Sequence, residues 1–224
     1  MALNETKTSI CNKALALLGE EAINSIDDNT TKAARVCKQF YDFSLQSVLS
    51  NGKWPFATVE VPVSRISHAD YSKEQKYVYA IPRDCVLILS VTPRGSRKQM
   101  HKGIDWDIRY VPEIEDSAII CNLESKTDSE TTAEIDQDEQ LMLEYIQCNN
   151  ASRSYPPMFV RCLVAQLAAD ICMSLTHDSN RFAAMLQLSE QLKAQALQQV
   201  LNEDGQDKMH WTDPITASRE GYIR

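Results

Sequence analysis

Apolar residues recur at helical spacing through the first fifty residues of the chain. This spacing predicts a helix over residues 8–18, and Gly19 directly after it is a typical helix end. A second, longer helix is expected to take its N-cap from Asp27-Asp28-Asn29 and to end at Ser50-Asn51-Gly52. Two helices joined by a short loop are typical of an αα-hairpin.

The period of the apolar residues changes to two from Ala57 onward. This alternation predicts a strand over residues 57–63, in which Pro62 favours a position at a sheet edge. No helical pattern separates the later strands, so we expect one small antiparallel β domain without βαβ units. Polar, acidic residues at 124–140 are interpreted as a surface loop, with a docking finger as the alternative. The later strands are predicted at residues 77–80, 85–91, 105–111, 117–123 and 141–147.

Helical spacing returns after Pro156 and Pro157, which suit the first turn of a helix. The helix predicted here runs to Leu175 and is apolar on nearly every side, so we expect it to be buried. A further helix is predicted over residues 180–201, with a narrower apolar stripe and a face rich in glutamine and glutamate.

The order of these elements predicts an α+β fold. We expect residues 1–53 and 155–203 to form a four-helix bundle, with residues 54–154 inserted as an antiparallel β domain. Trp54 and Phe56 flank a proline where helix gives way to strand, so both are predicted to be buried at the domain junction.

Residues 204–224 show no periodicity and are predicted to form an extended C-terminal tail. Disordered tails are usually poor in aromatic residues, whereas spaced apolar anchors suit a segment that orders on a partner. A frayed terminus is the alternative. The anchors in this segment are Trp211, Ile215, Tyr222 and Ile223.

Composition narrows the classes of function. The net charge of −8, from 31 acidic and 23 basic residues, argues against a protein that grips DNA phosphates. No apolar run approaches the roughly 18 residues of a membrane span, and the first residues do not resemble a signal peptide, so we expect a cytosolic start. The seven cysteines and four histidines do not cluster, which predicts free thiols and no metal or cofactor site.

Candidate catalytic chemistry is sparse. The six glycines form no phosphate-binding loop. Asp105 and Asp107 would share one face of a strand, as a metal or glycosidase site requires, but a lone D-x-D pattern is common. We therefore expect no enzyme. The alternative is a small hydrolase of envelope glycans that uses Asp105, Asp107 or an acid of residues 124–140.

Several short motifs follow one another along nearly the full chain. They are Ile10-Cys11-Asn12-Lys13-Ala14-Leu15-Ala16-Leu17-Leu18-Gly19, Ile23 with Ser25-Ile26-Asp27-Asp28, Ala33-Ala34, Trp54-Pro55-Phe56-Ala57, Tyr79-Ala80-Ile81-Pro82-Arg83-Asp84-Cys85, Pro157-Met158-Phe159, Leu167-Ala168-Ala169-Asp170-Ile171 and Leu175-Thr176. In this joint order the chain resembles the tail tubular protein A family, the adaptor proteins of short-tailed phages. Residues 124–140 match no motif of that family.

The resemblance implies a structural virion protein that is made in the host cytoplasm. Such adaptors form a twelve-membered ring between the portal and the tail nozzle, with tail fibres attached near the nozzle. Genomic DNA passes through the ring without specific binding, and no membrane is involved. A phage-encoded envelope-glycan hydrolase and an assembly chaperone that leaves the particle are the alternatives. The residues expected to bind the portal are Trp211, Pro214, Ile215, Arg219, Tyr222, Ile223 and Arg224.

Overall fold

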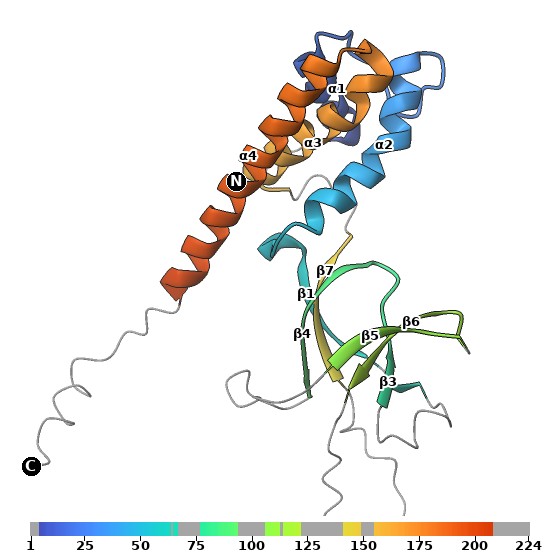
Figure 1. Ribbon diagram of the computed structural model, residues 1–224, viewed down its shortest axis with the longest axis vertical. Helices are drawn as coiled ribbons and strands as arrows, with labels where there is room; N and C mark the ends of the chain where they lie inside the picture. Colours follow the sequence, from blue (N-terminus) through green and yellow to red (C-terminus); the bar gives the residue numbers. More distant parts are fainter. Residues whose placement is uncertain are drawn as a thin grey trace, which may run out of the picture. The chain divides into compact units, whose positions relative to one another are not determined.

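The computed structural model is α+β, with four α-helices and two antiparallel sheets among the described residues (Figure 1). The described residues are 5–63, 65–66, 77–93, 106–112, 114–121, 141–148 and 155–207. The helices are α1 (Lys7–Leu18), α2 (Lys32–Leu49), α3 (Pro157–Thr176) and α4 (Ser179–Asp207), with a 3₁₀ turn at Pro55–Ala57. The strands are β1 (Thr58–Val63), β2 (Arg65–Ile66), β3 (Tyr77–Ala80), β4 (Cys85–Pro93), β5 (Trp106–Val111), β6 (Asp116–Cys121) and β7 (Leu141–Gln147).

The chain divides into two compact units. Met1–Ser44 and Tyr155–Arg224 form the first, which holds α1, most of α2, α3 and α4. Leu45–Ser154 forms the second, which holds every described strand and the last turn of α2. The two ends of the chain thus contribute to one unit, and the middle of the chain forms the other.

Helix α1 begins and ends at local capping residues. The Thr6 hydroxyl accepts a hydrogen bond from the Ser9 backbone N–H at 3.1 Å, as an N-cap does. Gly19 adopts the left-handed conformation, with φ of 73°, and its N–H donates to the Ala16 carbonyl. Gly19 is the end signal that the sequence predicts, whereas the helix begins one residue before its predicted start and its Thr6 cap was not predicted.

Helix α2 begins later than predicted. The expected N-cap was Asp27-Asp28-Asn29, but the Asp28 carboxylate accepts the Thr30 N–H at 2.9 Å and forms a local turn before the helix. The Thr31 hydroxyl accepts the Ala34 N–H at 3.2 Å instead, so Thr31 is the cap. Asp28, which the sequence pattern assigned to the N-cap, therefore forms the turn that precedes the helix.

Helix α3 is the core of the first unit, and α1 and α4 both pack against it. It is buried along almost its whole length, as expected for a helix that is apolar all round. Within the described residues, this 20-residue helix alone is long and apolar enough to cross a membrane, although the sequence reading expected no such stretch. Two-thirds of its most apolar window lies inside the protein, which is typical of a soluble core helix.

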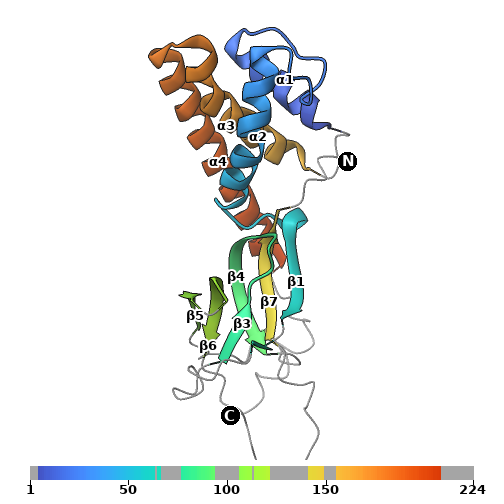
Figure 2. The same cartoon turned by 90° about the vertical axis from the view of Figure 1, so that its right-hand side faces the viewer.

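Helix α4 lies antiparallel to α3 in both views (Figures 1 and 2). Only Ser189 and Ala196 are buried along its described side chains, so it contacts the core through one narrow stripe. The helix continues to Asp207, past the predicted end near residue 201 and into the range assigned to the tail. Adding residues to an existing helix needs no new nucleus, which allows it to continue through Gly205.

The strands of the second unit form a three-stranded sheet in the order β1-β7-β4 and a four-stranded sheet in the order β2-β3-β6-β5. Figure 2 shows β4, β7 and β1 side by side. Side chains from both sheets share one core, and a smaller cluster lies on the opposite face of the four-stranded sheet. The shared core contains Val63, Tyr79, Val91, Ile119, Cys121, Leu141, Leu143 and Tyr145.

Candidate interaction surfaces

Trp54 is buried as predicted, with 6% of its surface exposed. Its indole N–H donates to the Val48 carbonyl at 3.0 Å, and this carbonyl in the last turn of α2 also accepts the Asn51 backbone N–H at 3.3 Å. Phe56 was also predicted to be buried but is only half-buried; the centroid of its ring lies 6.2 Å from that of Trp54, and the two rings are tilted by 57°. The two aromatic residues therefore fix the point where α2 ends and the strands begin.

Asp84 holds the turn before β4 against the middle strand β7. Its carboxylate accepts hydrogen bonds from the Gln147 amide at 2.6 Å and the Tyr145 hydroxyl at 3.1 Å. The bond from Gln147, followed by that from Tyr145, lowers the pKa of the Asp84 carboxyl. Burial raises the pKa of the Tyr145 hydroxyl to about 12, with the bond to Asp84 as a further cause. Asp84, part of the quoted motif Tyr79–Cys85, thus has a structural role here.

A chain of buried and half-buried hydrogen bonds connects three helices of the first unit. On α3, the Gln166 amide donates to Asp170 at 2.9 Å. Ser44 of α2 donates to the other oxygen of Asp170 at 2.5 Å, and Ser189 of α4 donates to the Gln166 carbonyl oxygen at 2.8 Å. Ser44 and Ser189 are fully buried, so their hydroxyl groups cannot bond to water and are satisfied by these hydrogen bonds instead. The sequence places Gln166 and Asp170 on a helix that is otherwise mostly apolar, but it does not identify their partners.

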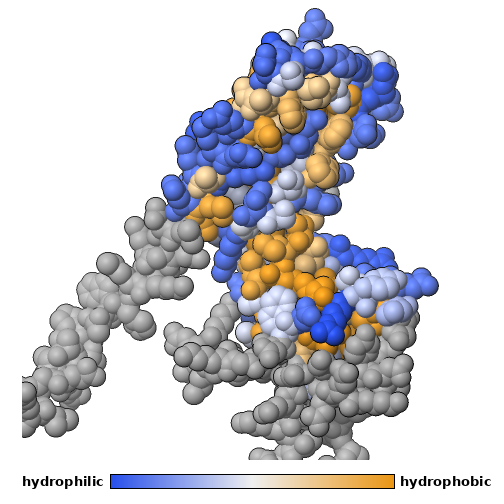
Figure 3. All heavy atoms as spheres, in the orientation of Figure 1, coloured by the Kyte–Doolittle hydropathy of each residue, from blue (hydrophilic) through white to orange (hydrophobic). Residues whose placement is uncertain are grey.

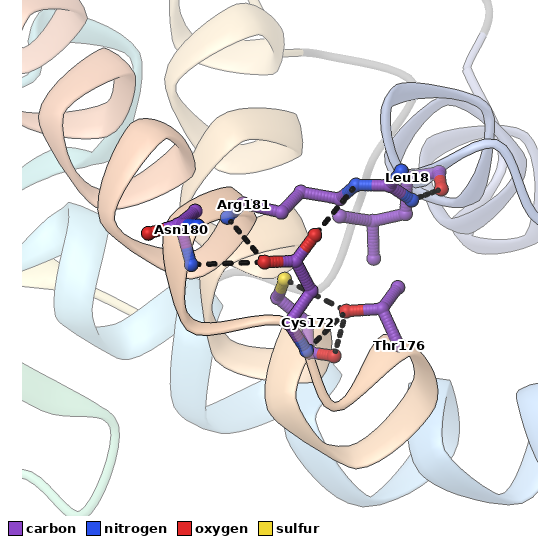
Figure 4. Close-up of polar contacts among 6 residues, drawn as sticks. Leu18, Cys172, Thr176, Asn180 and Arg181 are labelled. Atoms are coloured by element: carbon purple, nitrogen blue, oxygen red, sulfur yellow. Dashed lines mark hydrogen bonds and ion pairs between the residues drawn. The ribbon is translucent and has the colours of Figure 1, made fainter.

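The turn between α3 and α4 is joined to the end of α1 (Figure 4). The Asp178 carboxylate accepts the backbone N–H groups of Asn180 and Arg181 and caps α4. The Arg181 guanidinium donates to the Leu18 carbonyl at 2.6 Å, where the last turn of α1 lacks partners within the helix. His177 lies at the end of α3 in the left-handed conformation, with φ of 54°, so His177-Asp178 is a helix boundary.

Strand β5 carries exposed apolar side chains. Trp106, Ile108 and Tyr110 alternate along it and are 36%, 46% and 62% exposed. The β5–β6 register places Ile108 opposite Ile119 and Trp106 opposite Cys121, so this row lies on the sheet face that forms the shared core. The apolar face of the four-stranded sheet that forms the shared core therefore continues onto β5. No described residue covers this face at β5.

Other exposed apolar side chains lie on the helices. Phe43 of α2 is 63% exposed, while Leu186 and Leu197 of α4 are less exposed and eleven residues apart, close to three helical turns. Figure 3 shows hydrophobic residues gathered over the strands, whereas the outer surface of α4 is largely hydrophilic. An open polar groove of about 660 Å³ also lies beside α1, lined by Thr6, Thr8, Ser9, Asn12, Lys13, Ala16 and Asn24.

Several predicted functional residues lie outside the described part of the chain. These are Asp105, residues 124–140 and the expected portal-binding residues Trp211, Pro214, Ile215, Arg219, Tyr222, Ile223 and Arg224. Asp107 is described, and its exposed carboxylate pairs with the Arg109 guanidinium at 3.0 Å. No group of three metal-ligating side chains occurs among the described residues. Comparison with protein-family models gives no match, and neither does comparison with curated proteins.

Proposed function

We propose that this protein is a ring-forming adaptor of a short-tailed phage, joining the portal to the tail nozzle. The observation that carries the proposal is the arrangement of the chain: two helices, an antiparallel β unit, then two helices, with both chain ends in one unit. The hydrophobic pattern predicts this order, and the motifs that resemble the tail tubular protein A family follow one another through it.

The quoted motifs occupy defined positions in this arrangement, which supports the resemblance. Gly19 ends α1, Trp54 closes the end of α2 and Asp84 holds the turn before β4. Asp170 receives a hydrogen bond from α2. These four motif residues each stabilise an element boundary or a helix contact.

The finer features of the proposal combine the sequence pattern with the resemblance. The four helices form one bundle, and the subunits form a twelve-membered ring around the DNA exit channel. Residues 204–224 bind the portal through Trp211, Ile215 and Tyr222 as apolar anchors, with Arg219 and Arg224 paired to acids. Hot spots at interfaces are rich in Trp, Tyr and Arg, which supports this assignment. The net charge of −8 favours a channel through which DNA slides.

Mixing the purified protein with the portal protein of the same phage tests the proposal. Electron microscopy of the mixture is expected to show an added ring on one side of the portal, in twelvefold register with it. A portal protein from an unrelated phage is the matched control and is expected to remain bare. Portals that stay bare with the cognate protein in excess would rule out the adaptor function.

A further inference from the structure

The four edges of the two sheets differ in how well they are protected against pairing with another strand. β1 carries the exposed Pro62, which has no N–H to donate, and β4 contains two register irregularities. β2 has only two residues. β5 has six residues, no proline and a regular register with β6. Among the described edges, β5 is therefore the one most suited to accept a further strand.

The one protective feature on β5 comes from its own side chain. The Asp107 carboxylate accepts the Ile108 backbone N–H at 2.9 Å and the Arg109 guanidinium at 3.0 Å. Because the Ile108 N–H donates to this exposed side chain, it points toward the open edge of the sheet. An incoming strand could offer a carbonyl in place of the carboxylate, and Asp107 would then be available to a new cation.

The sequence of β5 is complementary to itself when two copies run antiparallel. With Ile108 opposite Ile108 of a second copy, Trp106 faces Tyr110 and Asp107 faces Arg109, each pair occurring twice. The aromatic pairs lie on the core face and the charged pairs on the other face, because side chains alternate along a strand. Opposite charges and aromatic pairs are the cross-strand neighbours that stabilise antiparallel sheets.

We propose that β5 is a self-association surface, through which two copies of this chain pair edge to edge about Ile108. The pairing joins the two four-stranded sheets and covers the exposed row Trp106, Ile108 and Tyr110 on both copies. We infer a second copy as the partner because the charges of β5 are complementary to those of another β5. The exposed apolar row continues the buried core, so a second copy would also cover it.

A pair of this kind is closed and weak. Both copies use the same strand, so the interface is isologous and leaves no β5 edge free to bind a third copy. Two six-residue strands bury less than a standard interface, so we expect a dissociation constant on the order of 10–100 μM. The pair differs from the head-to-tail contact of the proposed ring, and free subunits would dimerise without forming rings.

Charge reversal tests the register. Asp107→Arg or Arg109→Asp alone sets like charges opposite each other twice in the homodimer, and each is expected to weaken dimerisation about tenfold. An equimolar mixture of the two variants places a basic pair against an acidic pair and is expected to recover the wild-type affinity. Sedimentation of each variant and of the mixture measures these constants. The change to the Asp107–Arg109 pair within one strand cannot account for recovery on mixing.

Two further variants test the surface. Ile108→Lys is expected to abolish dimerisation. Phe43→Lys, at an exposed apolar residue of the first unit, is the control and should leave dimerisation unchanged. The substituted side chains are exposed, and circular dichroism checks that every variant is folded. A protein that is monomeric at about 1 mM, or a dimer whose variants fail to recover on mixing, would overturn the proposal. The purified chain is used alone, so the result does not depend on whether it binds a portal.

Discussion

Trp54 contributes to stability through packing and through a hydrogen bond, and two substitutions separate these contributions. Trp54→Ala is expected to cost about 3–5 kcal/mol, as large aromatic truncations in a core do. Trp54→Phe keeps an aromatic ring but leaves the Val48 carbonyl without the indole N–H, at a cost of about 1–2 kcal/mol. Urea denaturation followed by circular dichroism measures both. A loss below about 1 kcal/mol for Trp54→Ala would show that the ring contributes little to the fold.

Asp84 makes stability depend on pH in a defined direction. Its pKa is lowered in the folded state, so the folded protein holds the carboxylate more strongly than the unfolded chain does. This stabilisation is fully present above the ordinary carboxyl pKa of about 4 and is lost as the pH falls through the lower folded value. Asp84→Asn removes the titrating group. As the pH falls from about 5 to about 2, the unfolding free energy of Asp84→Asn should decrease less than that of the wild type.

The corresponding control is Asp116→Asn, at an exposed carboxylate for which no comparable side-chain partners occur among the described residues. This variant removes a carboxylate at a site without the partners of Asp84 and so controls for the loss of the carboxylate itself. If Asp84→Asn lost stability with acid as steeply as the wild-type protein, the hydrogen bonds from Gln147 and Tyr145 would not favour the charged form.

At the scale of the elements, Gly19 determines how α1 ends. Its φ of 73° is costly for a residue with a Cβ atom, while a Cβ added there would meet nothing within 4 Å. Gly19→Ala should therefore cost about 1 kcal/mol through backbone conformation alone. Gly19→Asn, which tolerates this conformation better, should cost less. Thermal unfolding of both variants checks the order, and an equal loss would mean that the backbone conformation is not the cause.

The hydrogen bonds among Ser44, Asp170, Gln166 and Ser189 hold α2 and α4 on α3. Asp170→Ala leaves the buried Ser44 hydroxyl and the Gln166 amide without their acceptor, and about 2–4 kcal/mol should be lost, since each unsatisfied group costs about 1–3 kcal/mol. Asp42→Ala removes an exposed carboxylate of α2, 3.7 Å from the Lys7 ammonium, and should change stability by less than about 0.5 kcal/mol. Chemical denaturation compares the two, and equal effects would contradict a role for the network.

At the scale of the whole molecule, the adaptor proposal predicts that residues 208–224 are needed for binding to the portal but not for folding. Deleting residues 208–224 leaves every described helix and strand in place, so thermal stability should be almost unchanged. The same deletion should abolish attachment to the cognate portal, because many copies of the tail together provide the avidity of a ring. Electron microscopy of mixtures with portal protein measures attachment. Full occupancy by the truncated protein would mean that the tail is not the portal-binding segment.

The sequence by itself determined most of the secondary structure. Strands β3 and β7 match their predicted bounds, and α1, β1, β5 and β6 differ by only one or two residues at either end. These elements were predictable because apolar periodicity and end signals such as Gly19 act over a few neighbouring residues. The short β2 and the start of α2 were missed. Strand β2 has too few residues to show a period, and the turn at Asp28 competes locally with a helix cap.

Only the tertiary structure decided how these elements combine. The separation of the strands into two sheets depends on pairing between distant segments such as β1 and β7, which local periodicity does not encode. The hydrogen-bond partners of Asp170 lie 4 and 126 residues away in the sequence. The edge of β5 is open because β6 pairs with it on one side only, which depends on the order of the strands in the sheet. Trp54 was predictable as a buried residue because it is large and apolar at a bend. The exposure of Trp106, with the same side chain, follows from the shared core ending before β5.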